Sequence, residues 1–195
     1  MLGAILIKEG ERFSEAEMAL QKAISFNPSD TAAFYNLGSL QEHLNLHEEA
    51  EASYRKAIEI DPAEVNTYHK LSKLLKSRGR TEDAISNLQK ALEIDPKDFI
   101  ALIEIASIQR TIGKAEEAKE SAEKARSIIP KDENYWYNLA CIEGILGDIE
   151  IAFENLRKAT QEKGIDKEWA WEDPDLQWIR DDPRFAEIVG PKPEK

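Results

Sequence analysis

Apolar and small residues recur along this chain with a spacing of 34 positions. In each repeat a large apolar residue is followed three positions later by a second one, and the next position is small. The three columns read Phe34, Tyr68, Leu102 and Trp136; Leu37, Leu71, Ile105 and Leu139; and Gly38, Ser72, Ala106 and Ala140. Positions three and four apart share one face of a helix. The pattern therefore predicts a series of helices with an apolar face, each with a small residue where a second helix approaches.

Further columns predict that second helix. Two alanine columns, two helical turns apart, form one apolar stripe. They are Ala16, Ala50, Ala84, Ala118 and Ala152, and Ala23, Ala57, Ala91, Ala125 and Ala159. A turn column of Asn45, Gly79, Gly113 and Gly147 is expected to end the first helix, because glycine adopts the left-handed conformation of a C-terminal cap. Prolines are expected to end the second helix, and they are Pro28, Pro62, Pro96 and Pro130.

Each repeat is thus expected to be a helix, a tight turn and an antiparallel helix. One such hairpin cannot bury its apolar stripe alone, so hairpins stack in series. The 34-residue period, the apolar–apolar–small triplet, the two alanines and the closing proline resemble the tetratricopeptide repeat. The resemblance implies an all-α fold, a right-handed α-solenoid of about five helix–turn–helix repeats. The expected parts are a truncated repeat at 1–30, repeats at 31–64, 65–98, 99–132 and 133–163, a C-terminal capping segment at 164–190 and a disordered tail at 191–195.

The capping segment contains two Asp-Pro steps, Asp173-Pro174 and Asp182-Pro183. Aspartate suits an N-cap and proline the first helical position, so each step is expected to open a short helix. The segment is also rich in tryptophan. We favour a cap on the last hairpin over the alternative, an aromatic patch that binds peptides. The phrase "DPDL…RDDPRF" is similar to the ending of many bacterial tetratricopeptide proteins, which suggests a prokaryotic source.

Charge and composition narrow the range of partners. The chain has 26 basic and 38 acidic residues, a formal net charge of −12, which disfavours nucleic acid and anionic membrane surfaces as partners. The single cysteine, Cys141, excludes an internal disulfide. The apolar run Met1–Ile7 is too short to cross a bilayer and has no cleavage-site pattern. We therefore expect a cytoplasmic protein.

No constellation of residues points to an enzyme or a cofactor. The phosphate-binding patterns GxxxxGK and GxGxxG are absent. His43 and His47 have a spacing that could hold a metal ion, but they straddle the expected turn and lack a third ligand. Cys141 is interpreted as a small helix residue rather than as a nucleophile. We expect no catalytic site, no metal and no cofactor.

The resemblance also implies a binding surface, because the first helix of each repeat lines a concave groove in this family. The corresponding positions are Tyr35, Ser39, Glu42, Asn66, His69, Lys70, Lys73, Lys76, Ile100, Ile103, Ser107, Arg110, Asn134, Tyr137 and Cys141. Four of these are basic and Glu42 is the one acidic position. An acidic chain with a basic groove suggests a protein or peptide ligand that is acidic or ends in a carboxylate. The plainer alternative is that Lys73 and Lys76 are ordinary solvated residues.

The carboxylate clamp that some family members use for chaperone tails is not expected here. Neither register of the repeats carries its lysine and asparagine set, and Glu104 would repel a carboxylate. Two further functions remain open from the sequence. One is self-association as a homo-oligomer through an N-terminal edge at Leu2–Ile7. The other is a docking or regulatory domain of a larger protein, because the fold alone does not name a partner.

Overall fold

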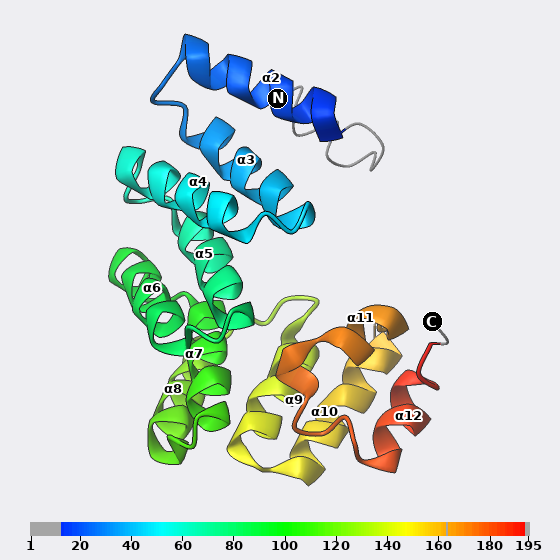
Figure 1. Cartoon of the computed structure of the whole chain (residues 1–195). Helices are drawn as coiled ribbons and strands as arrows, with labels where there is room; N and C mark the ends of the chain where they lie inside the picture. The colour runs from blue at the N-terminus through cyan, green and yellow to red at the C-terminus, as the bar shows by residue number, and fades with distance from the viewer. Residues whose placement is uncertain (1–12, 163, 194–195) are drawn as a thin grey trace. The chain divides into compact units, whose positions relative to one another are not determined.

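The computed structural model describes residues 13–162 and 164–193 and forms two compact units, residues 1–96 and 97–195. Within the described residues the secondary structure is eleven α-helices and one short 3₁₀ helix, with no strand (Figure 1). The all-α helical-repeat fold expected from the sequence is confirmed. The apolar run Met1–Ile7 and the end of the expected tail lie outside the described residues.

The N-terminal unit contains α2 (Phe13–Phe26), α3 (Thr31–His43), α4 (His47–Ile60), α5 (Val65–Ser77) and α6 (Thr81–Ile94). Helices α3 and α4 pack as one hairpin, and α5 and α6 pack as the next. Helix α5 also packs against α4 and touches α3. First helices therefore neighbour one another within this unit, as stacked hairpins require.

The C-terminal unit contains α7 (Phe99–Thr111), α8 (Ala115–Ile128), α9 (Tyr135–Leu146) and α10 (Ile149–Glu162). It continues with α11 (Lys167–Glu172), the 3₁₀ helix η1 (Pro174–Leu176) and α12 (Pro183–Val189). Both Asp-Pro steps open a helix as expected: Asp173 precedes η1, Asp182 precedes α12, and each carboxylate accepts a bond from a backbone N–H. Helix α12 packs against α10, and η1 packs against α9 and α7.

The turn and proline columns act as the sequence predicts. The turn residues Asn45, Gly79, Gly113 and Gly147 have φ of 59°, 74°, 81° and 89°, which is the left-handed region. Helices α2, α4, α6 and α8 each end two residues before a proline of the repeat. Local backbone chemistry therefore sets the helix ends.

A column of acidic residues, which is not among the columns predicted from the sequence, caps the first helices. Asp30, Glu64 and Asp98 stand 34 residues apart, and each accepts bonds from backbone N–H groups in the first turn of α3, α5 or α7. Such capping satisfies donors that a helix start leaves without partners. Helix α9 starts later than the period predicts: Asp132 accepts from the Asn134 N–H at 2.9 Å, and the helix begins at Tyr135. The signal was present in the sequence, two residues after each proline.

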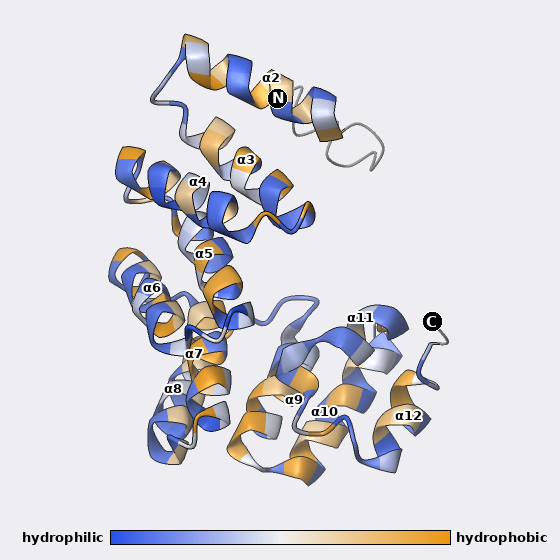
Figure 2. Cartoon of the chain, viewed as in Figure 1, coloured by the Kyte–Doolittle hydropathy of each residue, from blue (hydrophilic) through white to orange (hydrophobic). Residues whose placement is uncertain are grey.

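The cores follow the predicted stripes. The column alanines are buried except for Ala23, which is partly buried, and Ala50, Ala57, Ala84 and Ala91 have no exposed surface. In the C-terminal unit the core joins α9 and α10 to the capping segment. Its members include Phe153, Leu156, Leu176, Ile179, Phe185 and Val189. Figure 2 shows apolar residues along α9, α10 and α12, and each of these helices contributes members to this cluster.

Candidate functional site

The expected groove residues fall into two sets, one in each unit. We call those on α3 and α5 the N-terminal face; they are Tyr35, Ser39, Glu42, Asn66, His69, Lys70, Lys73 and Lys76. We call those on α7 and α9, together with the α9 N-cap, the C-terminal face; they are Ile100, Ile103, Ser107, Arg110, Asn134, Tyr137 and Cys141. The two faces differ sharply in exposure.

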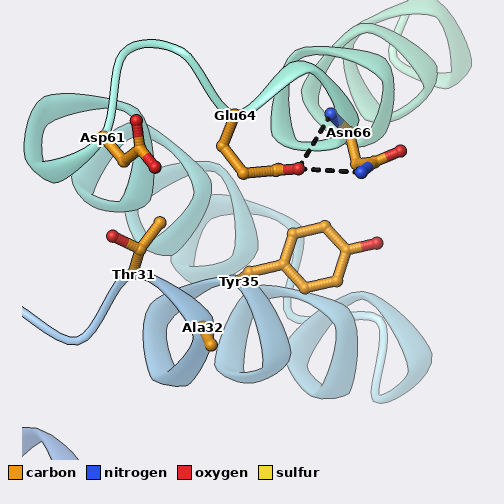
Figure 3. Close-up of a pocket in the computed structure, with 6 residues that line it drawn as sticks. All are labelled: Thr31, Ala32, Tyr35, Asp61, Glu64 and Asn66. Atoms are coloured by element: carbon orange, nitrogen blue, oxygen red, sulfur yellow. Dashed lines mark hydrogen bonds between the residues drawn. The ribbon is translucent and has the colours of Figure 1, made fainter.

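A pocket of about 350 Å³ opens on the N-terminal face. It is lined by Thr31, Ala32, Tyr35, Asp61, Glu64 and Asn66. The close-up in Figure 3 shows the Tyr35 ring extending from α3 towards Glu64 and Asn66 at the start of α5. The pocket therefore lies between two successive first helices, with an aromatic wall.

Glu64 gives this pocket a stable negative charge. Its carboxylate accepts bonds from the N–H and Oγ1 of Thr67 at 2.8 and 2.7 Å, and from the Nδ2 of Asn66 at 2.7 Å. Burial by itself would raise the pKa of this carboxyl group, but these bonds outweigh it and hold the pKa below its usual 4.5. The pKa of Tyr35 is raised by burial and then by the charges of Glu64 and Glu42. This end of the face is thus electronegative.

Two predicted groove residues are engaged by the core instead. The Tyr54 hydroxyl donates to Glu42 Oε2 at 2.9 Å and lies 3.1 Å from Ser39 Oγ. Tyr54 itself is fully buried, and burial raises the pKa of its hydroxyl. The polar atoms of Ser39 and Glu42 are thus paired with Tyr54. These two side chains stabilise the hairpin of α3 and α4, and a ligand would have to compete with Tyr54 for them.

The lysines of α5 form the other end of the N-terminal face. Lys73 is exposed, whereas Lys70 and Lys76 are partly buried. Within residues 13–162 and 164–193 none of the three forms an ion pair. Lys73 stands two turns beyond Asn66 on one helix face, about 10 Å along the axis. The N-terminal face therefore has an acidic pocket at one end and a basic cluster at the other.

The C-terminal face is mostly covered. Ile103, Ser107, Tyr137 and Cys141 are buried, whereas Ile100 is 50% exposed and Asn134 is exposed. The family resemblance implies an open groove for all of these side chains. In the structure, only Ile100, Asn134 and part of Arg110 are accessible.

Part of the cover is the chain's own capping segment. Tyr137 donates a hydrogen bond to the carboxylate of Asp173, and Trp169 stacks on the Tyr137 ring with centroids 4.7 Å apart. Further along, the Arg110 guanidinium lies 4.2 Å from the centre of the Trp178 ring. The position of the segment on this face could not be predicted from local sequence signals.

Neither candidate for chemistry gains support from the structure. Cys141 is 3% exposed, and burial, followed by the charges of Asp175 and Asp173, raises the pKa of its thiol well above the usual value. A buried neutral thiol is a poor nucleophile. Among residues 13–162 and 164–193, no three His, Cys, Asp or Glu side chains are placed to hold a metal ion. In that same part of the chain, no helix has the length and apolar character needed to cross a membrane.

Family models identify the repeats. Three models of the tetratricopeptide repeat match residues 30–97, 75–140 and 133–164. The chain belongs to the tetratricopeptide repeat family, whose stacked helix hairpins serve as scaffolds for protein interactions. No curated protein matches the sequence significantly.

Solved structures show the same fold. TTC0263, a thermophilic tetratricopeptide protein of Thermus thermophilus, is similar with a TM-score of 0.64 and 22% identity, over 96% of this chain and 95% of that chain. YrrB, a tetratricopeptide protein with an unusual peptide-binding site, has a TM-score of 0.55 and 21% identity, over 82% of each chain. The Pseudomonas aeruginosa protein pilF has a TM-score of 0.69 and 19% identity, over 96% of this chain and 85% of that chain. At these identities the likeness concerns the fold alone.

Proposed function

We propose that the protein is a non-enzymatic interaction scaffold that binds an extended peptide segment of a partner along its N-terminal face. The observation that carries this proposal is the open pocket beside Tyr35, on the same face as three lysines that form no ion pair in the described chain. YrrB, which shares the fold, has a peptide-binding site by its own description. The structure adds a charge pattern that the sequence alone did not suggest.

The charge pattern defines the ligand. The pocket carries Asp61 and the ionised Glu64, so it favours a basic side chain, which can also lie against the Tyr35 ring. Lys73 and Lys76 favour an acidic side chain at the other end of the face. Asn66, which lines the pocket, and Lys73 are separated by about 10 Å along the axis of α5. An extended strand advances about 3.3 Å per residue, so this separation corresponds to about three residues of the ligand. The expected ligand is a peptide with a basic and an acidic side chain about three residues apart.

Selection from a displayed peptide library tests the proposal. The immobilised full chain should enrich peptides with that charge spacing, and fluorescence anisotropy should then give their dissociation constants. The double change Lys73→Glu and Lys76→Glu should weaken binding of the enriched peptides at least tenfold, because both attractive contacts become repulsive.

A matched control separates the face from the overall charge. Lys119→Glu with Lys124→Glu changes the net charge by the same amount at two exposed positions of α8. This control should leave affinity within about twofold, since rim and remote charges act mainly through screened, long-range fields. Equal weakening by both double variants, or enrichment of peptides without the charge pair, would contradict the proposal.

A further inference from the structure

The capping segment reaches farther than a cap on the last hairpin requires. That hairpin is formed by α9 and α10, and α12 and η1 already pack against these helices. Residues after η1 nevertheless cross to α7, which belongs to the preceding repeat. There Gln177 Nε2 lies 3.5 Å from Ser107 Oγ, and the Trp178 ring faces the Arg110 guanidinium at 4.2 Å. Covering the hairpin of α9 and α10 does not by itself explain these additional contacts with α7.

Three polar contacts of this segment are made to positions predicted to line the binding groove. Asp173 accepts from the Tyr137 hydroxyl, Gln177 meets Ser107, and Trp178 stacks on Arg110.

Apolar anchors hold the same stretch to the same face. Leu176 is fully buried and Ile179 is 2% exposed, in one cluster with Tyr137 and Cys141. Arg110 also donates to the carbonyl oxygen of Gly144 at 2.6 Å, so α9 fixes the guanidinium in position for the indole. A carboxylate, buried branched residues and an aromatic ring in one short segment are the features of a bound peptide ligand.

We infer that the C-terminal face is a peptide-binding surface and that residues 173–180 are its resident ligand, held in cis. The partner that fits this face is a segment with the same chemistry. It has a carboxylate for Tyr137, a branched apolar residue for the buried site, and an aromatic ring for Arg110. Such a segment binds by displacing residues 173–180. This inference does not depend on the N-terminal face.

Tethering explains why the site is closed in the resting chain. A ligand attached to its own receptor acts at an effective concentration of about millimolar. A free peptide with equal intrinsic affinity must therefore reach about that concentration before it competes. Weakening the internal contacts lowers this threshold, because cation–π and hydrogen-bond contacts are then lost only from the internal ligand.

The first experiment adds a fluorescent peptide of residues 172–181 to the full-length chain. The wild-type chain should bind it only at about millimolar peptide, and the variant with Gln177→Ala and Trp178→Ala should bind it at least tenfold more tightly. Adding Arg110→Ala to that variant should remove the gain, whereas adding Lys73→Glu and Lys76→Glu should leave it unchanged. A sequence-scrambled peptide should not bind. A folded double variant, checked by circular dichroism, that binds no better than wild type overturns the inference.

A second experiment uses the unaltered sequence and so does not depend on how the variant folds. The full chain is labelled with 5-fluorotryptophan, and the Trp178 signal is assigned by its loss in Trp178→Phe. Unlabelled peptide at a few millimolar should shift this signal to the position of a solvent-exposed indole. A Trp178 signal that stays unchanged at all peptide concentrations shows that the segment is a permanent part of the core, and overturns the inference.

Discussion

The ring of Tyr54 lies directly against the backbone of Gly38. A β-carbon at position 38 would stand 2.7 Å from Tyr54 Cε1, closer than such atoms approach in proteins. Tyr54 is the largest residue in its column, where the other repeats carry Leu20, Leu88, Ala122 and Leu156. Gly38 is the smallest residue of the facing small column. The second repeat thus matches its largest second-helix side chain with the smallest first-helix residue.

Replacing Gly38 by alanine should destabilise the N-terminal unit. Alanine improves helix propensity by about 0.5–1 kcal/mol, but overpacking a rigid, buried ring costs about 1–3 kcal/mol. The free energy of unfolding should therefore fall by about 1 kcal/mol, and circular dichroism should show this as a lower urea midpoint.

Gly144→Ala is the matched control, since Gly144 is also a buried helical glycine. Here a β-carbon would meet Ile179 Cγ2 at 3.5 Å and Trp178 Cβ at 3.7 Å, which is ordinary contact. The higher helix propensity of alanine should then raise the free energy of unfolding by about 0.5 kcal/mol. If Gly38→Ala and Gly144→Ala shift the urea midpoint in the same direction, the contact with Tyr54 is not the reason why position 38 requires a small residue.

Among the residues that the structure describes, Asn45 is the one non-glycine residue with a positive φ, which is 59°. Asn45→Ala should cost about 1 kcal/mol, because a β-carbon without a local hydrogen-bonding group is strained in the left-handed region. Asn45→Gly should stay within about 0.5 kcal/mol of wild type, because relief of strain is offset by greater freedom in the unfolded chain. Thermal unfolding of both variants measures the difference, and equal melting temperatures would contradict the role assigned to this turn.

Glu64 should make stability depend on pH in the acidic range. Its carboxyl pKa is held below 4.5 in the folded chain, so the folded state binds the proton more weakly than the unfolded state. The stabilisation of the folded state by the Glu64 charge is therefore complete above about pH 4.5. It is lost as the pH falls through the lower pKa of the folded chain.

The variant Glu64→Gln tests this dependence. It should be less stable than wild type by about 1 kcal/mol at pH 7, the usual value of an N-cap. The gap should narrow as the pH falls from 4.5 through the lower, folded pKa, because the unfolded wild-type chain binds a proton at this carboxyl group before the folded chain does. Urea unfolding at several pH values measures both chains. Parallel stability curves from pH 7 to pH 3 would show that Glu64 does not contribute through its charge.

Cys141 should be protected from thiol reagents in the folded chain. It is the single cysteine, it is 3% exposed, and burial raises the pKa of its thiol. Reaction with an aromatic disulfide reagent at pH 8 should be at least about 100-fold slower than in urea, because the thiolate is the reactive form. Cysteine-containing peptide in the same buffer supplies the reference rate. Rapid labelling without denaturant would show that the core around Leu176 opens readily.

Much of the fold was predictable because its determinants are local. The glycines and Asn45 of the turn column, and the prolines of the repeat, fix helix ends through backbone preferences that operate within a few residues. The buried alanine stripe follows from helical periodicity. The acidic N-caps such as Asp30 and Glu64 were equally local, and the same period reveals them in retrospect.

The groove residues were less predictable, because exposure depends on what packs against a side chain. Tyr35 and Asn66 line a pocket, as residues of an exposed face can. Ser39 and Glu42 occupy equivalent helical positions but are bound to Tyr54 from the neighbouring helix. No pattern along α3 distinguishes these cases, since the partner belongs to another element.

The sequence by itself determined the repeat, its helices, their ends and the apolar stripes, because periodicity, turn residues and prolines act over short stretches of chain. Only the tertiary structure decided which first-helix face stays accessible. Residues 173–180 settle against Ser107, Arg110 and Tyr137, about 36–70 positions away along the chain, through contacts that depend on shape and distance in space. The same residue types at the same helical register therefore line a pocket in one unit and lie beneath the chain's own end in the other.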